Sequence, residues 1–82
     1  MEWVMNKWSG LLYDDGKDRT IWPEQKHLPH KFRLLDDDGN IYGYGQASEN
    51  DTEAAFEPLD YYLPRYGCTE IQYYNDGKWE PL

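Results

Sequence analysis

Three consecutive aspartates followed by glycine and asparagine form the motif with the clearest potential for chemistry in this chain. Alternating carboxylate and amide oxygens, as in Asp36, Asp38 and Asn40, are how a helix–loop–helix calcium site begins. Such a loop has glycine at its sixth position and glutamate at its twelfth, whereas here glycine is fourth and the twelfth residue is Ala47. We therefore expect a solvated turn between two strands, and we predict neither a metal nor another cofactor.

Histidine and cysteine are too few and too scattered to indicate an active site. Pro29 lies between His27 and His30, and no third metal ligand is near them in sequence. Cys68 is better explained as a small buried residue than as a nucleophile, which would need a neighbouring base and electropositive surroundings. The chain also lacks a phosphate-binding glycine loop and a nucleophile elbow. We predict a protein that is not an enzyme and has no catalytic residues.

Two predicted β-hairpins must position the acidic side chains. The first covers about residues 31–46, where alternation places Phe32, Leu34 and Ile41 towards the core. Its returning strand carries two glycines on one face, which allow a ring or a helix to approach closely. The second hairpin, about residues 69–80, turns at Asp-Gly, a pair that favours the primed turns of hairpins.

A short helical segment, about residues 52–63, is predicted between the hairpins. Asp51 or Thr52 can cap it, and Pro58 fits the first turn of a helix but not its interior. Pro64 and Gly67 are expected to end it. The sequence thus predicts an α+β fold in which a small antiparallel sheet built from two hairpins carries this helix on one face.

The first thirty residues give weaker signals. We expect an extended strand over about Glu2–Lys7 and a short strand at Thr20–Trp22, which Pro23 ends. No linker or low-complexity stretch divides the chain, so residues 1–82 are interpreted as one domain.

The charge of the chain constrains its partners. Sixteen acidic residues against eight basic ones give a net charge of −8, which argues against direct binding to nucleic acid and to anionic membranes. A charged partner should therefore be a basic protein. The alternative is that the acidity serves solubility alone.

The tyrosine-rich stretch from Asp60 to Tyr66 is the best candidate for a contact surface. Tyrosine offers rigid apolar area together with a hydroxyl group and is enriched where proteins bind each other. The alternative is that Tyr62 and Leu63 pack the helix on the sheet while Tyr61 and Tyr66 lie half exposed. The predicted protein-binding residues are Asp36, Asp37, Asp38, Glu49, Asp51, Glu53, Glu57, Asp60, Tyr61 and Tyr66.

Cysteine usage and the N-terminus bear on location. A single cysteine excludes an intrachain disulfide. The first residues lack the basic and apolar regions of a secretory signal, and no apolar run is long enough to cross a membrane. We therefore expect a cytoplasmic protein.

Four segments carry a resemblance to known sequences. They are Lys31–Tyr42 (KFRLLDDDGNIY), Phe56–Asp60 (FEPLD), Gly67–Tyr73 (GCTEIQY) and Asn75–Glu80 (NDGKWE). Together they resemble a set of small acidic proteins from bacterial, phage and plasmid genomes, and the resemblance covers about residues 31–82. It implies a mobile-element context, in which small acidic proteins sometimes block host defence proteins that bind nucleic acid. The resemblance carries over no functional residues.

Three hypotheses follow. The first is a non-enzymatic acidic module that binds a basic or nucleic-acid-binding groove of a host protein, as a mobile-element inhibitor would. The second is a structural protein that assembles as a homo-oligomer through its edge strands, with acidity serving only solubility. The third is a small metal-binding or catalytic domain, which would require a cleft that gathers His27, His30 or Cys68 with carboxylates.

Overall fold

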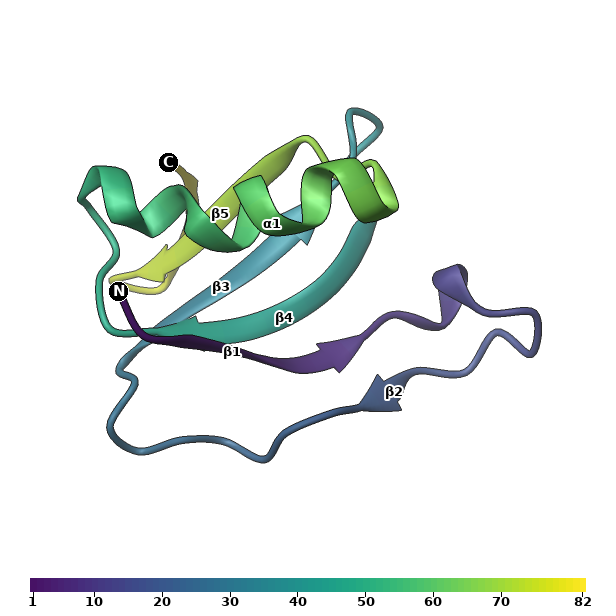
Figure 1. Cartoon of the computed structure of the whole chain (residues 1–82), viewed down its shortest axis with the longest axis horizontal. Coiled ribbons are helices and arrows are strands. Elements are labelled where there is room, and N and C mark those ends of the chain that lie inside the picture. The colour runs from purple at the N-terminus through teal and green to yellow at the C-terminus, as the bar shows by residue number, and fades with distance from the viewer.

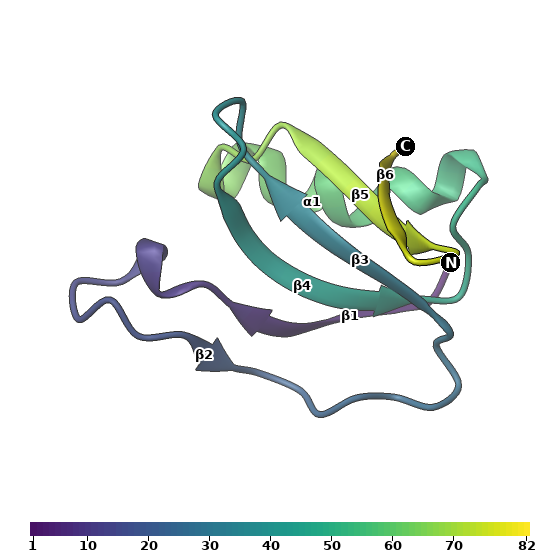
Figure 2. The same cartoon turned by 180° about the vertical axis from the view of Figure 1, so that it is seen from behind.

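One antiparallel sheet and a helical segment that covers one of its faces make up most of the fold, and a short 3-10 turn, η1 (Gly10–Leu12), follows the first strand. The computed structural model describes residues 1–82. Figure 1 shows the helical segment across one face of the sheet, and Figure 2 shows the sheet from its other side. The six strands lie in the order β2-β1-β4-β3-β5-β6. Their bounds are β1 Trp3–Trp8, β2 Arg19–Thr20, β3 His30–Leu35, β4 Ile41–Ala47, β5 Glu70–Asn75 and β6 Lys78–Pro81.

Both predicted hairpins are present. β3 pairs with β4 to form the first, β5 pairs with β6 to form the second, and the pairing of β3 with β5 joins them. The second hairpin turns through Asp76 and Gly77, whose φ angles are 51° and 83°. Positive φ at both central residues is the signature of a type I′ turn, whose twist matches that of the strands. The predicted α+β fold is therefore confirmed.

The N-terminal segment extends the sheet beyond the two hairpins. β1 pairs with β4, as expected of a strand near Glu2–Lys7, and β2 pairs with the end of β1. The predicted strand at Thr20–Trp22 is only partly correct, because β2 ends at Thr20. The side-chain amide of Asn6 donates to the carbonyl oxygens of Trp22 and Pro23, at 3.3 and 3.2 Å, and these bonds hold the chain beyond the strand.

The core lies between the sheet and the helical segment. Phe32 and Leu34 are fully buried in it, as predicted. The prediction for Ile41 is wrong. A register shift between Leu34 and Leu35 pairs Leu35 with Ile41, and Ile41 is partly exposed and outside the core cluster.

The helical segment begins with the 3-10 turn η2 (Glu53–Phe56) and continues as α1 (Glu57–Tyr66). Pro58 lies in the first turn of α1 and Gly67 ends the helix with a φ of 79°, both close to expectation. Pro64, however, does not end the helix but lies inside it. A proline there lacks the N–H that would donate to the carbonyl of Asp60, and its ring crowds that carbonyl. Asp60 is exposed to water, and the helix continues to Tyr66.

Aromatic rings attach α1 to β1. Tyr62 lies between the indoles of Trp3 and Trp8, with ring centroids at 5.8 and 4.8 Å. Leu63, the other residue considered for packing, is 46% exposed. No helix in the structure is both long and apolar enough to cross a membrane.

Candidate protein-binding site

The strongest concentration of acidic side chains lies on the segment that leads into α1. We call residues 49–60 the acidic helix segment. It contains no lysine, arginine or histidine, and its acids are Glu49, Asp51, Glu53, Glu57 and Asp60. Glu53, Glu57 and Asp60 are four and three residues apart, a spacing that places helical side chains on neighbouring turns of one side. The buried residues of the segment are Ala55, Pro58 and Leu59, and Ala55 and Leu59 anchor it in the core cluster.

Few interactions within the chain occupy these carboxylates. The N-terminal ammonium of Met1 lies 3.6 Å from Glu57, and the hydroxyl of Thr52 donates to Glu49 at 3.0 Å. Asp51, Glu53 and Asp60 are exposed and form no ion pair in the structure. The acids at the start of the helical segment also interact favourably with its dipole. The segment therefore presents an array of carboxylates that a partner can reach.

The aspartates of the β3–β4 turn play a different part. The carboxylate of Asp36 accepts hydrogen bonds from the backbone of Asp38 and from the backbone and side chain of Asn40. The hydrogen bond from the Asn40 side chain is the main reason why the pKa of Asp36 is lowered. Asp37 accepts a hydrogen bond from the hydroxyl of Thr69 at 2.5 Å. Asp36 and Asp37 thus stabilise the loop, and Asp38 is exposed beside them.

The structure separates the ten predicted contact residues. The aspartate turn precedes β4, whereas Glu49 follows its other end, so a strand of seven residues lies between the two acidic groups. At about 3.3 Å per residue the separation is roughly 20 Å. Asp36, Asp37 and Asp38 are therefore separated by the length of β4 from Glu49, where the acidic helix segment begins.

Tyr61 and Tyr66 lie at different places along α1. They are 47% and 46% exposed, and each also packs against a tryptophan of β1. The guanidinium of Arg65 lies 3.8 Å from the centroid of the Tyr61 ring. Both tyrosines thus help to hold the helix while leaving about half of their surface open. Tyr61 adjoins Asp60 and extends the acidic helix segment.

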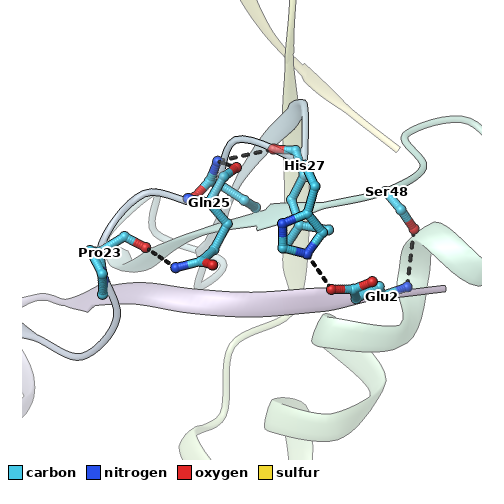
Figure 3. A network of polar contacts seen from close by, with 7 residues as sticks. Glu2, Pro23, Gln25, His27 and Ser48 are labelled. Carbon is cyan, nitrogen blue, oxygen red and sulfur yellow. Dashed lines mark hydrogen bonds and ion pairs between the residues drawn. The ribbon is translucent and has the colours of Figure 1, made fainter.

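The residues considered for catalysis are not arranged as a reactive centre. Cys68 is fully buried, and burial raises the pKa of its thiol, which disfavours the nucleophilic thiolate. His27 instead contacts Glu2 at 2.5 Å, and Figure 3 shows this contact beside the loop residue Gln25. The structure contains no group of three or more histidine, cysteine or acidic side chains that could hold a metal ion.

Sequence reasoning missed a second surface, on the sheet face opposite α1, which we call the open face. Four strands place Lys7, Tyr44, Arg33 and Gln72 in one row of directly opposed residues. The alternation of β3 and β4 indicated that Arg33 and Tyr44 face away from the core. The place of Lys7 could not be found in this way, because it depends on the pairing of β1 with β4.

Part of the open face is covered by the loop between β2 and β3. The side chain of Gln46 accepts from the backbone N–H of Gln25 and donates to the carbonyl oxygens of Gln25 and Leu28. Figure 3 shows Gln25 turned towards the carbonyl of Pro23, to which its amide donates. Trp22 in this loop is 58% exposed, and no sequence signal had marked it as a surface residue.

The fold and its surfaces define a class: a small α+β domain with an acidic helical segment on one side of the sheet and an open face on the other. Comparisons with protein-family models, with curated proteins and with solved structures find no match to this chain.

Proposed function

We propose that the protein is a non-enzymatic binding module that uses the acidic helix segment to occupy a basic groove on a protein partner. The observation that carries this proposal is the run from Glu49 to Asp60, which holds five carboxylates and no basic side chain. The core anchors the run through Ala55 and Leu59, so the backbone that carries its carboxylates is ordered before binding. A surface organised in advance loses less conformational entropy when it binds.

A groove that binds nucleic acid is the best partner surface for such a segment. Grooves of this kind are lined with lysine and arginine that neutralise phosphates, and a row of carboxylates offers them the same charge. Tyr61 beside the carboxylates adds apolar contact area of the kind found at the centre of interfaces. The protein would then act in the cytoplasm as an inhibitor from a mobile element, directed at a host protein and not at nucleic acid itself.

The edges of the sheet favour this function over assembly into a homo-oligomer. β2 pairs with Lys7 and Trp8 of β1, the chain that follows β2 bonds to Asn6, and β6 has four residues, the last of them Pro81. Short edge strands and edge prolines are features that prevent pairing with another sheet. Native mass spectrometry checks this point: the binding module is expected to be a monomer, and a dimer at low micromolar concentration would favour assembly.

The test compares two triple variants with the same change in net charge. E53Q/E57Q/D60N removes three carboxylates from the acidic helix segment, whereas D14N/D76N/E80Q removes three exposed carboxylates elsewhere. Each protein is immobilised, and proteins retained from a bacterial lysate are identified by mass spectrometry. We expect the wild type and the control to retain the same basic protein and the helix variant to lose it. Equal retention by both variants would contradict the proposal.

A further inference from the structure

The open face contains a groove of about 400 Å³. It lies over the middle strands, between the loop that carries Glu24 and the edge strand that carries Trp79. Its volume is in the range of sites that bind a small molecule or a short piece of chain. Its polar and aromatic lining includes Asn6, Lys7, Glu24, Lys31, Tyr44 and Trp79.

The groove gathers positive charge in a protein whose net charge is −8. Lys7 and Lys31 line it, and Arg33 lies next to Tyr44 in the register of the sheet. The Arg33 side chain donates to Gln72 at 2.8 Å and lies 4.4 Å from the centroid of the Trp79 ring, with no carboxylate partner. Three of the eight basic residues of the chain are therefore on this face.

The two lysines have only weak partners within the chain. Lys31 is 3.8 Å from Glu24, and Lys7 is 3.4 Å from Asp18. The Lys31 and Glu24 side chains are 59% and 71% exposed, and exposed pairs of this kind contribute little to stability. A carboxylate from another molecule can therefore replace Glu24. Because the carboxylate of Glu24 already pairs with Lys31 in the groove, we expect the groove to accept a carboxylate.

We propose that the groove binds an acidic peptide segment of a second protein partner. Carboxylates of the segment contact Lys7 and Lys31, while Tyr44 and Trp79 supply the apolar contact area. Tryptophan, tyrosine and arginine are the residue types that dominate binding energy at protein interfaces. This inference does not depend on the proposed function, because the acidic helix segment lies on the other side of the sheet.

Nucleic acid fits the groove less well than an acidic peptide. Binding of single strands requires open ring faces on which bases stack. Trp79 has the guanidinium of Arg33 near its ring and contacts the rings of both Tyr44 and Tyr74. Lys7 lies 5.5 Å from the centroid of the Tyr44 ring. The net charge of the chain would also repel a long polyanion more strongly than a short acidic peptide.

The experiment is an NMR titration of the full ¹⁵N-labelled chain. The probe is a blocked octapeptide of alternating glycine and glutamate, with the glycine–glutamine peptide as its control. We expect saturable shifts at the Trp79 indole and at the amides of Lys7 and Lys31 with the acidic peptide only. Absence of saturable shifts at millimolar peptide would overturn the proposal.

Charge variants locate the binding site. K7Q/K31Q should weaken binding about tenfold, equivalent to about 1.4 kcal/mol, whereas K17Q/K78Q, with the same change in charge, should leave it within about twofold. E24Q should strengthen binding, because it removes the competing carboxylate. Equal weakening by both double variants would overturn the proposal, because the attraction would then be general.

Two further measurements test other occupants of the groove, single-stranded DNA and a second copy of the chain. Single-stranded dT8 that binds at least as tightly as the acidic peptide would overturn the proposal in favour of nucleic acid. A dimer in native mass spectrometry that K7Q/K31Q abolishes would overturn it in favour of a second copy of the chain. A monomer that prefers the acidic peptide supports it. None of these measurements uses E53Q/E57Q/D60N, the variant that tests the proposed function.

Discussion

At the scale of single residues, a glycine determines how closely two strands and a ring can pack. A Cβ atom added at Gly45 would lie 2.3 Å from Cζ of Phe32 and 2.4 Å from the carbonyl oxygen of Val4. At Gly43 the nearest atom would be Cε3 of Trp8, at 2.7 Å. The sequence indicated that a ring or a helix can approach this strand closely, but it could not identify which.

Gly45→Ala should therefore destabilise the protein more than Gly43→Ala. Overpacking of a dense core typically costs about 1–3 kcal/mol, and Gly45→Ala should lie at the upper end because the backbone oxygen that its Cβ would meet is at 2.4 Å, whereas the one at Gly43, that of Lys7, is at 2.8 Å. Urea unfolding followed by circular dichroism measures both. A smaller loss of unfolding free energy for Gly45→Ala than for Gly43→Ala would contradict the packing described.

Tyr73 connects the core to the start of the helical segment. Its hydroxyl donates to the carbonyl oxygen of Ala55 at 2.8 Å, and both residues are buried. Burial is the main reason why the pKa of Tyr73 is raised, and the charges of Glu57 and Glu49 raise it further. The buried phenol is therefore stabilised in its neutral form.

Alkaline pH should weaken the fold through this tyrosine. An unfolded tyrosine ionises near pH 10, and the folded state resists ionisation at Tyr73. Its contribution to the unfolding free energy is thus complete below about pH 10 and falls as the pH rises towards the higher folded pKa. Tyr73→Phe should lower the unfolding free energy by about 1–2 kcal/mol at neutral pH. The difference in unfolding free energy between this variant and the wild type should shrink above about pH 10.

Urea unfolding at a series of pH values checks this prediction. The control is Tyr74→Phe, because Tyr74 is exposed and its ring contact with Trp79 is kept. It should change the unfolding free energy little at neutral pH. A difference between Tyr73→Phe and the wild type that stays constant through strongly alkaline pH would contradict the role of Tyr73.

At the scale of elements, local signals identified the hairpins and the helix, but not how strands distant in sequence pair. The Asp-Gly turn and strand alternation were sufficient for β3 to β6. The pairing of β1 with β4, the shift after Leu34 and the continuation of α1 through Pro64 depend on tertiary contacts. Most of the acidic helix segment was therefore predictable from sequence, whereas the groove on the open face was not.

The end of α1 offers a test confined to one element. Gly67 has a φ of 79°, and a Cβ atom there would have no neighbour within 4 Å. Gly67→Ala should therefore cost about 1–2 kcal/mol through backbone strain alone, and Gly67→Asn should cost less because asparagine tolerates this conformation. Urea unfolding measures the unfolding free energy of both variants. A larger loss for Gly67→Asn than for Gly67→Ala would contradict this explanation.

At the scale of the whole molecule, the charges are divided between the two sides of the sheet. The acidic helix segment lies on the side of α1, and Lys7, Lys31 and Arg33 lie on the open face. The net charge of the sequence showed only that acidic residues outnumber basic ones, and not where each kind lies on the fold. The acidic helix segment thus presents carboxylates alone, whereas the open face presents three basic residues together with Glu24, the ion-pair partner of Lys31.

The ionic strength dependence of binding tests the proposed function most directly. The measurement is the Kd of the chain for the basic protein that it retains, titrated from low to high salt. Exposed charges are screened beyond about 10 Å at 0.1 M salt and beyond about 3 Å at 1 M. The wild type should therefore bind more weakly as salt rises, and E53Q/E57Q/D60N should depend on salt much less. A wild-type Kd that is unchanged between low and high salt would contradict binding through the acidic helix segment.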